Sequence, residues 1–125
     1  MNTVAMTGRI TKTPVIEEVG NEKKFKKCTF TIMVKTKRKI GEGSYRSDAI
    51  QCEATGGLLK TLELIVVKGS PLAITGEIRT NSWGGGETFR QYSYINVEML
   101  EVLENKEQTD KRKALLEEKE KSTPS

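Results

Sequence analysis

The 125-residue sequence contains no histidine and only two cysteines, Cys28 and Cys52, which lie far apart in the chain. The absence of histidine removes the commonest general base and the Ser-His-Asp arrangement of hydrolases. It also excludes Cys/His zinc sites, and two cysteines are too few for a four-cysteine site. We therefore expect no catalytic residues and no metal, and two buried free thiols in a reducing compartment.

Long apolar segments and nucleotide-binding motifs are missing as well. The longest apolar run, Leu64–Val67, is far too short to cross a bilayer, and the N-terminus lacks the pattern of a signal peptide. No Walker loop or dinucleotide fingerprint occurs, and the acidic residues are scattered without a spacing that pairs them. The sequence thus predicts a cytoplasmic protein that is not an enzyme, needs no cofactor and contacts no membrane.

Positive charge is concentrated in one segment although the net charge is only +4. Residues 23–39 contain no acidic residue and eight basic ones: Lys23, Lys24, Lys26, Lys27, Lys35, Lys37, Arg38 and Lys39. Such a block creates a local positive field suited to a phosphate backbone. Charge alone does not choose between phosphate binding and a second interpretation, in which solvated lysines keep an edge strand from pairing with other chains.

Hydrophobic periodicity predicts five strands and one helix. Alternating apolar residues indicate strands at 2–9, 25–35, 47–54, 72–81 and 89–103, the last bent near Glu98. An apolar stripe from Leu58 to Val66 indicates a helix, which Gly56 and Gly57 open and Gly69 closes at the C′ position. Glycine-rich loops are expected at 40–46 and 81–88.

The order strand, strand, strand, helix, strand, strand is that of the OB-fold. We therefore expect an all-β protein with one helix, folded as a five-stranded barrel over residues 1–104. From residue 105 onward lysine, glutamate and glutamine dominate. Residues 105–125 are expected to form a charged tail, disordered or partly helical, with a frayed helix over 109–121.

Five segments in this order resemble the bacterial and phage single-stranded DNA-binding family. They are the opening strand with its glycine and later proline (2–14), the two core strands 30–34 and 48–56, Lys68-Gly69-Ser70, and the strand 74–83 that ends in a tryptophan. The resemblance covers residues 1 to about 104 and implies single-stranded DNA binding in replication, recombination or repair, near the nucleoid. It also implies a homotetramer, with a dimer as the alternative.

The sequence departs from this family at its usual aromatic positions. Members commonly carry aromatics near Lys37 or Arg38, at Ala49 and at Thr55, where this chain has none. Many bacterial members also end in an acidic, phenylalanine-tipped tail, whereas this chain ends in Ser-Thr-Pro-Ser. Recruitment of partners by the tail is therefore in doubt, and a divergent phage, plasmid or mobile-element member fits these departures better than a principal chromosomal one.

Single strands are held by flat side chains that stack on bases and by cations on phosphates. Trp83 is the first stacking candidate because it stands beside Gly84, Gly85 and Gly86, and the remaining candidates are Tyr45, Tyr92 and Tyr94. The two later tyrosines share one strand face, opposite Ile95 and Val97, and ordinary cross-strand packing is their alternative role. The expected phosphate contacts are Lys35, Lys37, Arg38, Lys68 and Arg79.

Two other functions stay open at the sequence level. Since a fold does not fix a function, an OB-fold that binds a protein, in replication restart or as an inhibitor, is the alternative with little or no nucleic-acid binding. RNA is the alternative ligand, because stacking and phosphate contacts serve both kinds of strand.

Overall fold

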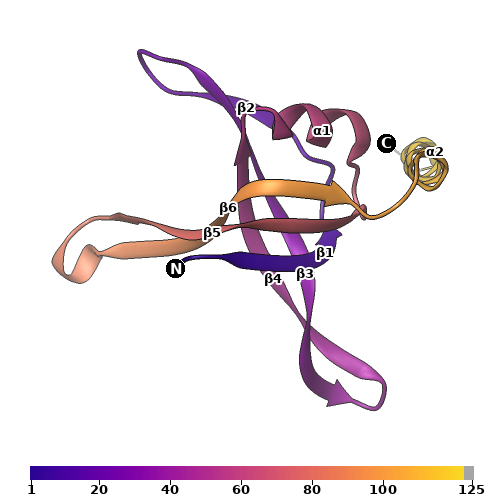
Figure 1. The fold of residues 1–125 in the computed structure, drawn as a ribbon, viewed down its shortest axis with the longest axis horizontal. Coiled ribbons are helices and arrows are strands. Elements are labelled where there is room, and N and C mark those ends of the chain that lie inside the picture. The colour runs from indigo at the N-terminus through magenta and orange to yellow at the C-terminus, as the bar shows by residue number, and fades with distance from the viewer. Residues whose placement is uncertain (123–125) are drawn as a thin grey trace.

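The computed structural model describes residues 1–122, in which strands dominate (Figure 1). The elements are β1 (Val4–Ile10), β2 (Ile16–Val19), β3 (Phe25–Gly41), β4 (Ser44–Thr55), α1 (Leu58–Ile65), β5 (Pro71–Trp83), a short 3-10 helix (Gly86–Thr88), β6 (Arg90–Val102) and α2 (Lys106–Ser122). The last three residues of the predicted tail, 123–125, lie outside the described residues.

Five of these strands close into a barrel. The sheet order is β1-β5-β6-β4-β3-β2, and a further pairing of β1 with β3 joins the two ends of the five-stranded ring. All pairings are antiparallel except that of β4 with β6. The helix α1 lies between β4 and β5, so the predicted OB-fold order of strands and helix is confirmed.

The barrel interior is filled by the alternate residues of its strands. Within the barrel, one face of each of these five strands is buried or half-buried, as the predicted alternation required. The core consists of Ile10, Cys28, Phe30, Ile32, Cys52, Ala54, Leu62, Val66, Leu72, Ile74, Ile95 and Val97. Both cysteines are free and buried, which confirms their predicted state.

The strand β2 was not predicted. It follows Pro14 and pairs antiparallel with the start of β3, where Glu17 lies opposite Lys27 and Glu18 opposite Lys26. Four residues with two adjacent carboxylates give no clear alternation, so the periodicity did not reveal the strand. The resulting β2–β3 hairpin places part of the lysine-rich segment on an extended arm of the molecule (Figure 1).

The loop predicted at 40–46 is wrong. The strand β3 continues to Gly41 and β4 begins at Ser44, so only Glu42 and Gly43 connect them. Gly43 has a φ of 73°, a left-handed conformation that suits glycine in so short a turn. Tyr45 therefore lies on β4 rather than in a loop, and β3 and β4 form a long arm.

The helix α1 also ends earlier than predicted. Its last residue is Ile65, and Val66 already has extended backbone dihedrals, so Gly69 is not the C′ residue. Val66 and Val67 turn inward and are buried instead. The hydroxyl of Ser70 accepts a hydrogen bond from the backbone N–H of Val67 at 3.0 Å, which stabilises this turn into β5.

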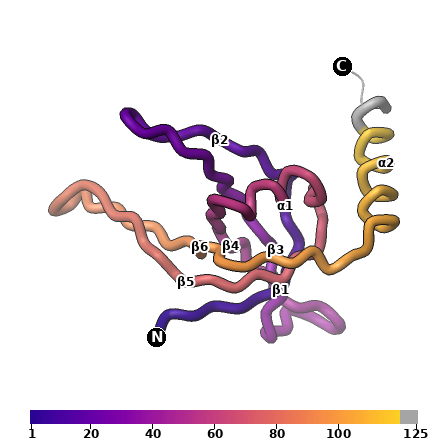
Figure 2. The backbone as a smooth tube through the Cα atoms, turned by 45° about the horizontal axis from the view of Figure 1, so that its top comes forward, coloured from indigo at the N-terminus to yellow at the C-terminus, as the bar shows by residue number. Residues whose placement is uncertain are grey.

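The helix α2 is attached to the barrel by polar contacts at its beginning. Asn105 and Gln108 form a reciprocal capping box, with N···O distances of 3.0 and 2.8 Å. The side chain of Glu104, only 5% exposed, pairs with Arg112 at 3.1 Å and accepts a hydrogen bond from Thr109. Figure 2 shows the helix running away from the barrel beyond these contacts.

Candidate nucleic-acid interface

The β5–β6 hairpin extends well beyond the barrel (Figure 1). The two strands pair without a register shift from Gly76 opposite Val97 to Trp83 opposite Arg90. Alternate residues of a strand share a face, and residues directly opposite one another do so too. One face of this arm therefore carries Arg79, Asn81, Trp83, Arg90, Tyr92 and Tyr94.

Three aromatic side chains lie in sequence along that face. The ring centres of Trp83 and Tyr92 are 5.8 Å apart in an edge-to-face arrangement, and those of Tyr92 and Tyr94 are 5.7 Å apart. Trp83 is 55% exposed and Tyr92 is 43% exposed. The expectation that the two tyrosines share a face opposite Ile95 and Val97 is confirmed.

Trp83 occupies a different element from the one expected. It is the last residue of β5, paired with Arg90, and the loop begins only at Gly84. Gly84 and Gly86 have φ values of 79° and 59°, so the chain reverses here through conformations that favour glycine. The indole is thus presented by a paired strand, whose backbone is fixed, and not by a free loop.

Two further polar residues on this face were not among the predicted site residues. Arg90 lies opposite Trp83, and Asn81 donates a hydrogen bond from Nδ2 to the hydroxyl oxygen of Tyr92 at 2.8 Å. The alternation that grouped Tyr92 with Tyr94 also includes Arg90, so the signal was present in the sequence. Arg79, which was predicted, lies opposite Tyr94 and 3.6 Å from the carboxylate of Glu77.

The β3–β4 hairpin holds a second group of the predicted residues. Lys35, Lys37 and Arg38 are exposed near its end, and the ammonium of Lys39 lies 5.9 Å from the ring centre of Tyr45. The register shifts between Lys35 and Lys39, so the strand is irregular where its cations are densest. This arm leaves the barrel in a different direction from the β5–β6 hairpin (Figure 1).

Lys68 belongs to neither arm. It lies in the connection between α1 and β5, where its backbone N–H donates to the hydroxyl of Thr13 at 3.0 Å. Trp83 ends the strand that follows Lys68, so the full length of β5 separates them. The structure therefore gathers Arg79, Trp83, Tyr92 and Tyr94 on one arm, gathers Lys35, Lys37, Arg38 and Tyr45 on another, and leaves Lys68 apart.

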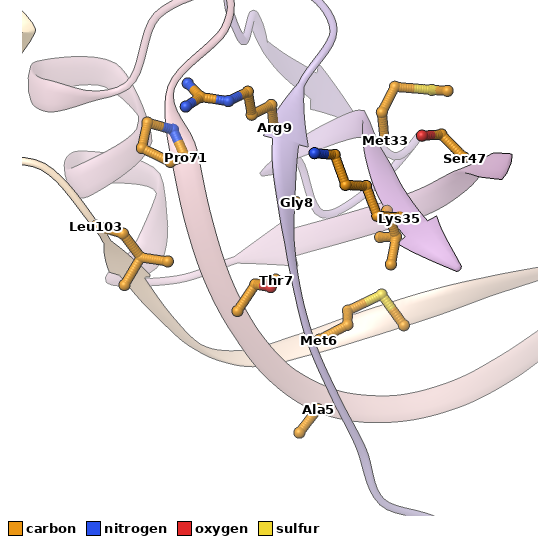
Figure 3. Close-up of a pocket in the computed structure, with 11 residues that line it drawn as sticks. Ala5, Met6, Thr7, Gly8, Arg9, Met33, Lys35, Ser47, Pro71 and Leu103 are labelled. Carbon is orange, nitrogen blue, oxygen red and sulfur yellow. The ribbon is translucent and has the colours of Figure 1, made fainter. Parts of the chain in front are cut away.

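A groove of about 640 Å³ follows β1 on the side of β3 and β4 (Figure 3). Its lining is mainly apolar, with Ala5, Met6, Met33 and Leu103, and includes the cations Arg9 and Lys35. The strand β1 pairs with β3 only at Arg9 and Ile10, which leaves the preceding residues of β1 without a β3 partner.

Residues 1–122 were compared with the requirements of a metal site and of a membrane-spanning helix. That part of the chain has no group of three or more His, Cys, Asp or Glu side chains placed to hold a metal ion. Nor does it contain a helix of the length and apolar character needed to cross a membrane.

The barrel belongs to the OB-fold class, because five strands close it and a helix lies between β4 and β5. Its arms carry exposed aromatic side chains and cations. A solved structure described as Plasmodium falciparum SSB complex with ssDNA has the same fold. The TM-score is 0.69 at 16% sequence identity, with 83% of this chain and 96% of that chain covered.

Sequence comparison identifies the family. Residues 1–103 match the Single-strand binding protein family, and the chain belongs to it. It is 30% identical over 108 residues to single-stranded DNA-binding protein 3 of Listeria innocua, and 32% identical over 93 residues to the single-stranded DNA-binding protein of Clostridium perfringens. The matches cover 86% and 74% of this chain, and 66% and 59% of those proteins, so the chain spans less than two thirds of either relative.

Proposed function

We propose that this protein binds single-stranded DNA without sequence preference, in replication, recombination or repair, including the DNA processing of phages and mobile elements. Family membership supports the ligand class, and both relatives are named for binding single-stranded DNA. Stacking on flat side chains is tolerant of sequence because every base has a π-face. The proposed contacts are the nine predicted residues Lys35, Lys37, Arg38, Tyr45, Lys68, Arg79, Trp83, Tyr92 and Tyr94.

The exposure of Trp83 carries this proposal. A structural tryptophan is ordinarily well buried, whereas this indole is 55% exposed and contacts another exposed ring, that of Tyr92. An exposed indole in an arm that also carries arginine offers both stacking and phosphate contacts to a single strand.

The test is a titration of the protein with oligo-dT, followed by the fluorescence of Trp83, the only tryptophan in the chain. Stacking of a base on the indole should quench its emission at low salt. Oligo-rU and a DNA duplex serve as competitors, and the duplex should compete poorly because its bases are not exposed. Absence of quenching and of binding to labelled oligo-dT would favour the alternative function, an OB-fold that binds a protein.

Trp83→Ala provides the matched variant. One base stack contributes about 1–3 kcal/mol, so its loss should weaken oligo-dT binding about 5- to 150-fold. Since the variant has no tryptophan, fluorescence anisotropy of a labelled oligonucleotide replaces quenching as the readout. An unchanged affinity would remove the indole from the contact surface.

We propose that binding involves no catalytic step and no cofactor, and that the protein acts in the cytoplasm at the nucleoid. Family proteins are binding proteins, and the chain has no histidine to serve as a general base. Incubation of labelled single strands with the protein and Mg²⁺ or Ca²⁺ should leave them intact. Release of shorter products by the purified protein, but not by a mock preparation, would contradict this.

We also propose that residues 1–104 form the binding domain and that it assembles as a homotetramer, with a dimer as the alternative. The groove along β1 supports this because it joins apolar side chains to a strand segment that pairs with β5 on one edge and has no β3 partner on the other. Light scattering coupled to gel filtration distinguishes monomer, dimer and tetramer. A monomer at micromolar concentration would contradict the proposal.

A further inference from the structure

The helix α2 contacts the turn that carries Lys68, the predicted phosphate contact that belongs to neither arm. We propose that Arg112, on α2, is a positioning residue for Lys68, because it holds the turn from which the Lys68 side chain projects. Residues 66–70 are named the Lys68 turn. The inference rests on the proposed single-strand binding, and it gives α2 a part in that function.

The barrel holds the Lys68 turn through the end of β1 and the segment that follows it. The N–H of Lys68 donates to the hydroxyl of Thr13 at 3.0 Å, and the N–H of Gly69 donates to the carbonyl oxygen of Ile10 at 2.9 Å. Nη1 of Arg9 donates to the carbonyl oxygen of Gly69 at 2.9 Å. The bonds from Lys68 and Arg9 are exposed, so water competes for their partners and each adds little net stability. The turn therefore depends on further contacts to stay in place.

Two consecutive residues of α2 supply such contacts. A Cβ added to Gly69 would lie 3.1 Å from Nη1 of Arg112 and 3.9 Å from its Cδ and Cζ, so the guanidinium group lies against the backbone of this glycine. Gly69 has a φ of 87°, a left-handed conformation that favours glycine. Lys113 donates from Nζ to the carbonyl oxygen of Leu64 at 3.0 Å. The helix thus contacts the chain within the Lys68 turn and also just before it.

Glu104 fixes the side chain of Arg112. Nε and Nη2 of Arg112 donate to the two carboxylate oxygens of Glu104 at 3.3 and 3.1 Å, and the hydroxyl of Thr109 donates to Oε1 at 3.1 Å. Because the Glu104 side chain is only 5% exposed, salt screens this ion pair less than it screens a surface pair. A bond to each carboxylate oxygen also fixes the plane of the guanidinium group. Arg112 is therefore held firmly enough to limit the movement of Gly69.

The ion pair of Arg112 also keeps Arg9 at the turn. The pKa of Glu104 is lowered mainly by hydrogen bonding from Arg112 and, as a smaller cause, by the charge of Arg9, so both cations lie near this carboxylate. Without Arg112, the carboxylate is left without its main partner and attracts Arg9. Arg9 would then leave the carbonyl oxygen of Gly69, and the turn would lose a contact on each side. A mobile turn presents Lys68 to a phosphate at a larger cost in conformational entropy.

A double-mutant cycle tests the positioning role, with binding measured as fluorescence anisotropy of labelled oligo-dT. Lys68→Ala should weaken binding about two- to fivefold and lower the slope of log K against log salt by about 0.7, as expected for one phosphate contact. Arg112→Ala should approach these losses in the wild-type background and cause little further loss in the Lys68→Ala background. Lys111→Ala is the matched control, because it removes the same charge from an exposed neighbour in α2 that pairs with Glu107.

Amide exchange, followed by NMR on the free protein, tests the holding of the turn without DNA. The N–H groups of Lys68 and Gly69 are both hydrogen-bonded, so their exchange reports the opening of the turn. Arg112→Ala should accelerate both, whereas Lys111→Ala should not. The double variant Glu104→Gln, Arg112→Ala avoids an unpaired buried carboxylate and should accelerate both amides as well. Circular dichroism checks that every variant is folded.

The outcomes separate this inference from the proposed function. If wild-type protein binds oligo-dT but Lys68→Ala binds equally well, the positioning role is wrong and single-strand binding stands. Equal losses from Arg112→Ala in both backgrounds, or the same loss from Lys111→Ala, would show that Arg112 does not act through Lys68. Unchanged amide exchange in Arg112→Ala would show that α2 does not hold the turn. If wild-type protein binds no single strand, the proposed function itself fails, and the exchange data alone decide whether α2 holds the turn.

Discussion

The side-chain amide of Asn2 forms two hydrogen bonds with the backbone of Ile78. Its Nδ2 donates to the carbonyl oxygen of Ile78 at 2.7 Å, and its Oδ1 accepts from the N–H of Ile78 at 2.8 Å. The last backbone pair of β1 and β5 is Val4 with Gly76. The amide of Asn2 therefore extends the pairing of β1 and β5 by imitating one more residue of a strand, at the point where the β5–β6 arm leaves the barrel.

Asn2→Ala should destabilise the protein by about 1 kcal/mol, since each hydrogen bond contributes about 0.5–1.5 kcal/mol and both are exposed. Urea unfolding measures this change. Thr3→Ala, at the adjacent exposed residue, is the matched control. Equal midpoints for wild-type protein and Asn2→Ala would show that the amide does not stabilise the fold.

Gly76→Ala should destabilise the protein by about 1–3 kcal/mol. A Cβ at this position would overlap the carbonyl oxygen of Asn96 on β6, a backbone atom that cannot move without disturbing the sheet. Gly41→Ala is the control because a Cβ there has no neighbour within 4 Å. Thermal unfolding of both variants gives the comparison, and similar melting temperatures would contradict the prediction.

Both thiols should be unreactive in the native protein. Burial raises the pKa of Cys52 to about 12 and also raises the pKa of Cys28, so the reactive thiolate is scarce at pH 8. We expect a disulfide reagent such as DTNB to modify neither thiol in native protein and both in guanidinium. Rapid modification without denaturant would show that the barrel opens readily.

The attachment of α2 should weaken in acid. The pKa of Glu104 lies below its ordinary value, and the main cause is the hydrogen bonding from Arg112 to its carboxylate. The stabilisation is therefore fully present above the unfolded-state pKa of about 4.3 and is lost as the pH falls through the lower folded-state value. Amide exchange of α2, followed by NMR from pH 6 to pH 3, should accelerate relative to that of the barrel.

Glu104→Gln is the reference for this acid effect, because it removes the carboxylate and keeps the shape. Its α2 amides should exchange faster at pH 6 and show a smaller additional change in acid. The same acid response in wild-type protein and Glu104→Gln would assign the effect to other carboxylates.

Removal of the β3–β4 cations should reduce the salt dependence of oligo-dT binding. Each phosphate contact contributes about 0.7 to the slope of log K against log salt for single strands. The triple variant Lys35→Ala, Lys37→Ala, Arg38→Ala should thus lower the slope by up to about 2. Lys60→Ala on α1 is the control, and an unchanged slope in the triple variant would exclude this arm from the phosphate path.

Sequence periodicity was sufficient to predict the strands whose alternate residues are buried in the core. The strands around Phe30, Ile74 and Ile95 alternate between core and solvent, so both their existence and their faces were predicted correctly. The same alternation placed Tyr92 and Tyr94 together on an outward face. Helix α1 was found for the equivalent reason, since one stripe of apolar residues covers the barrel.

The extent of the β3–β4 arm could not be predicted because its strands bury little apolar surface. The end of β3, from Lys37 to Gly41, and the start of β4 are exposed on both faces, so backbone pairing holds them and no apolar pattern reveals it. The separation of Lys68 from Trp83 is a different case, because the strand predicted at 72–81 already lay between these two residues, and β5 confirms that order.

Two short seams close the barrel, and they have a mechanical consequence. The seam between β1 and β3 and the seam between β4 and β6 have only two residue pairs each, and they join two antiparallel three-stranded sheets, β2-β3-β4 and β1-β5-β6. The β3–β4 arm with its lysines belongs to the first sheet, and the β5–β6 arm with its aromatic rings belongs to the second. A ligand that binds both arms thus connects the two sheets, and its binding should slow the local opening of the barrel at these two seams.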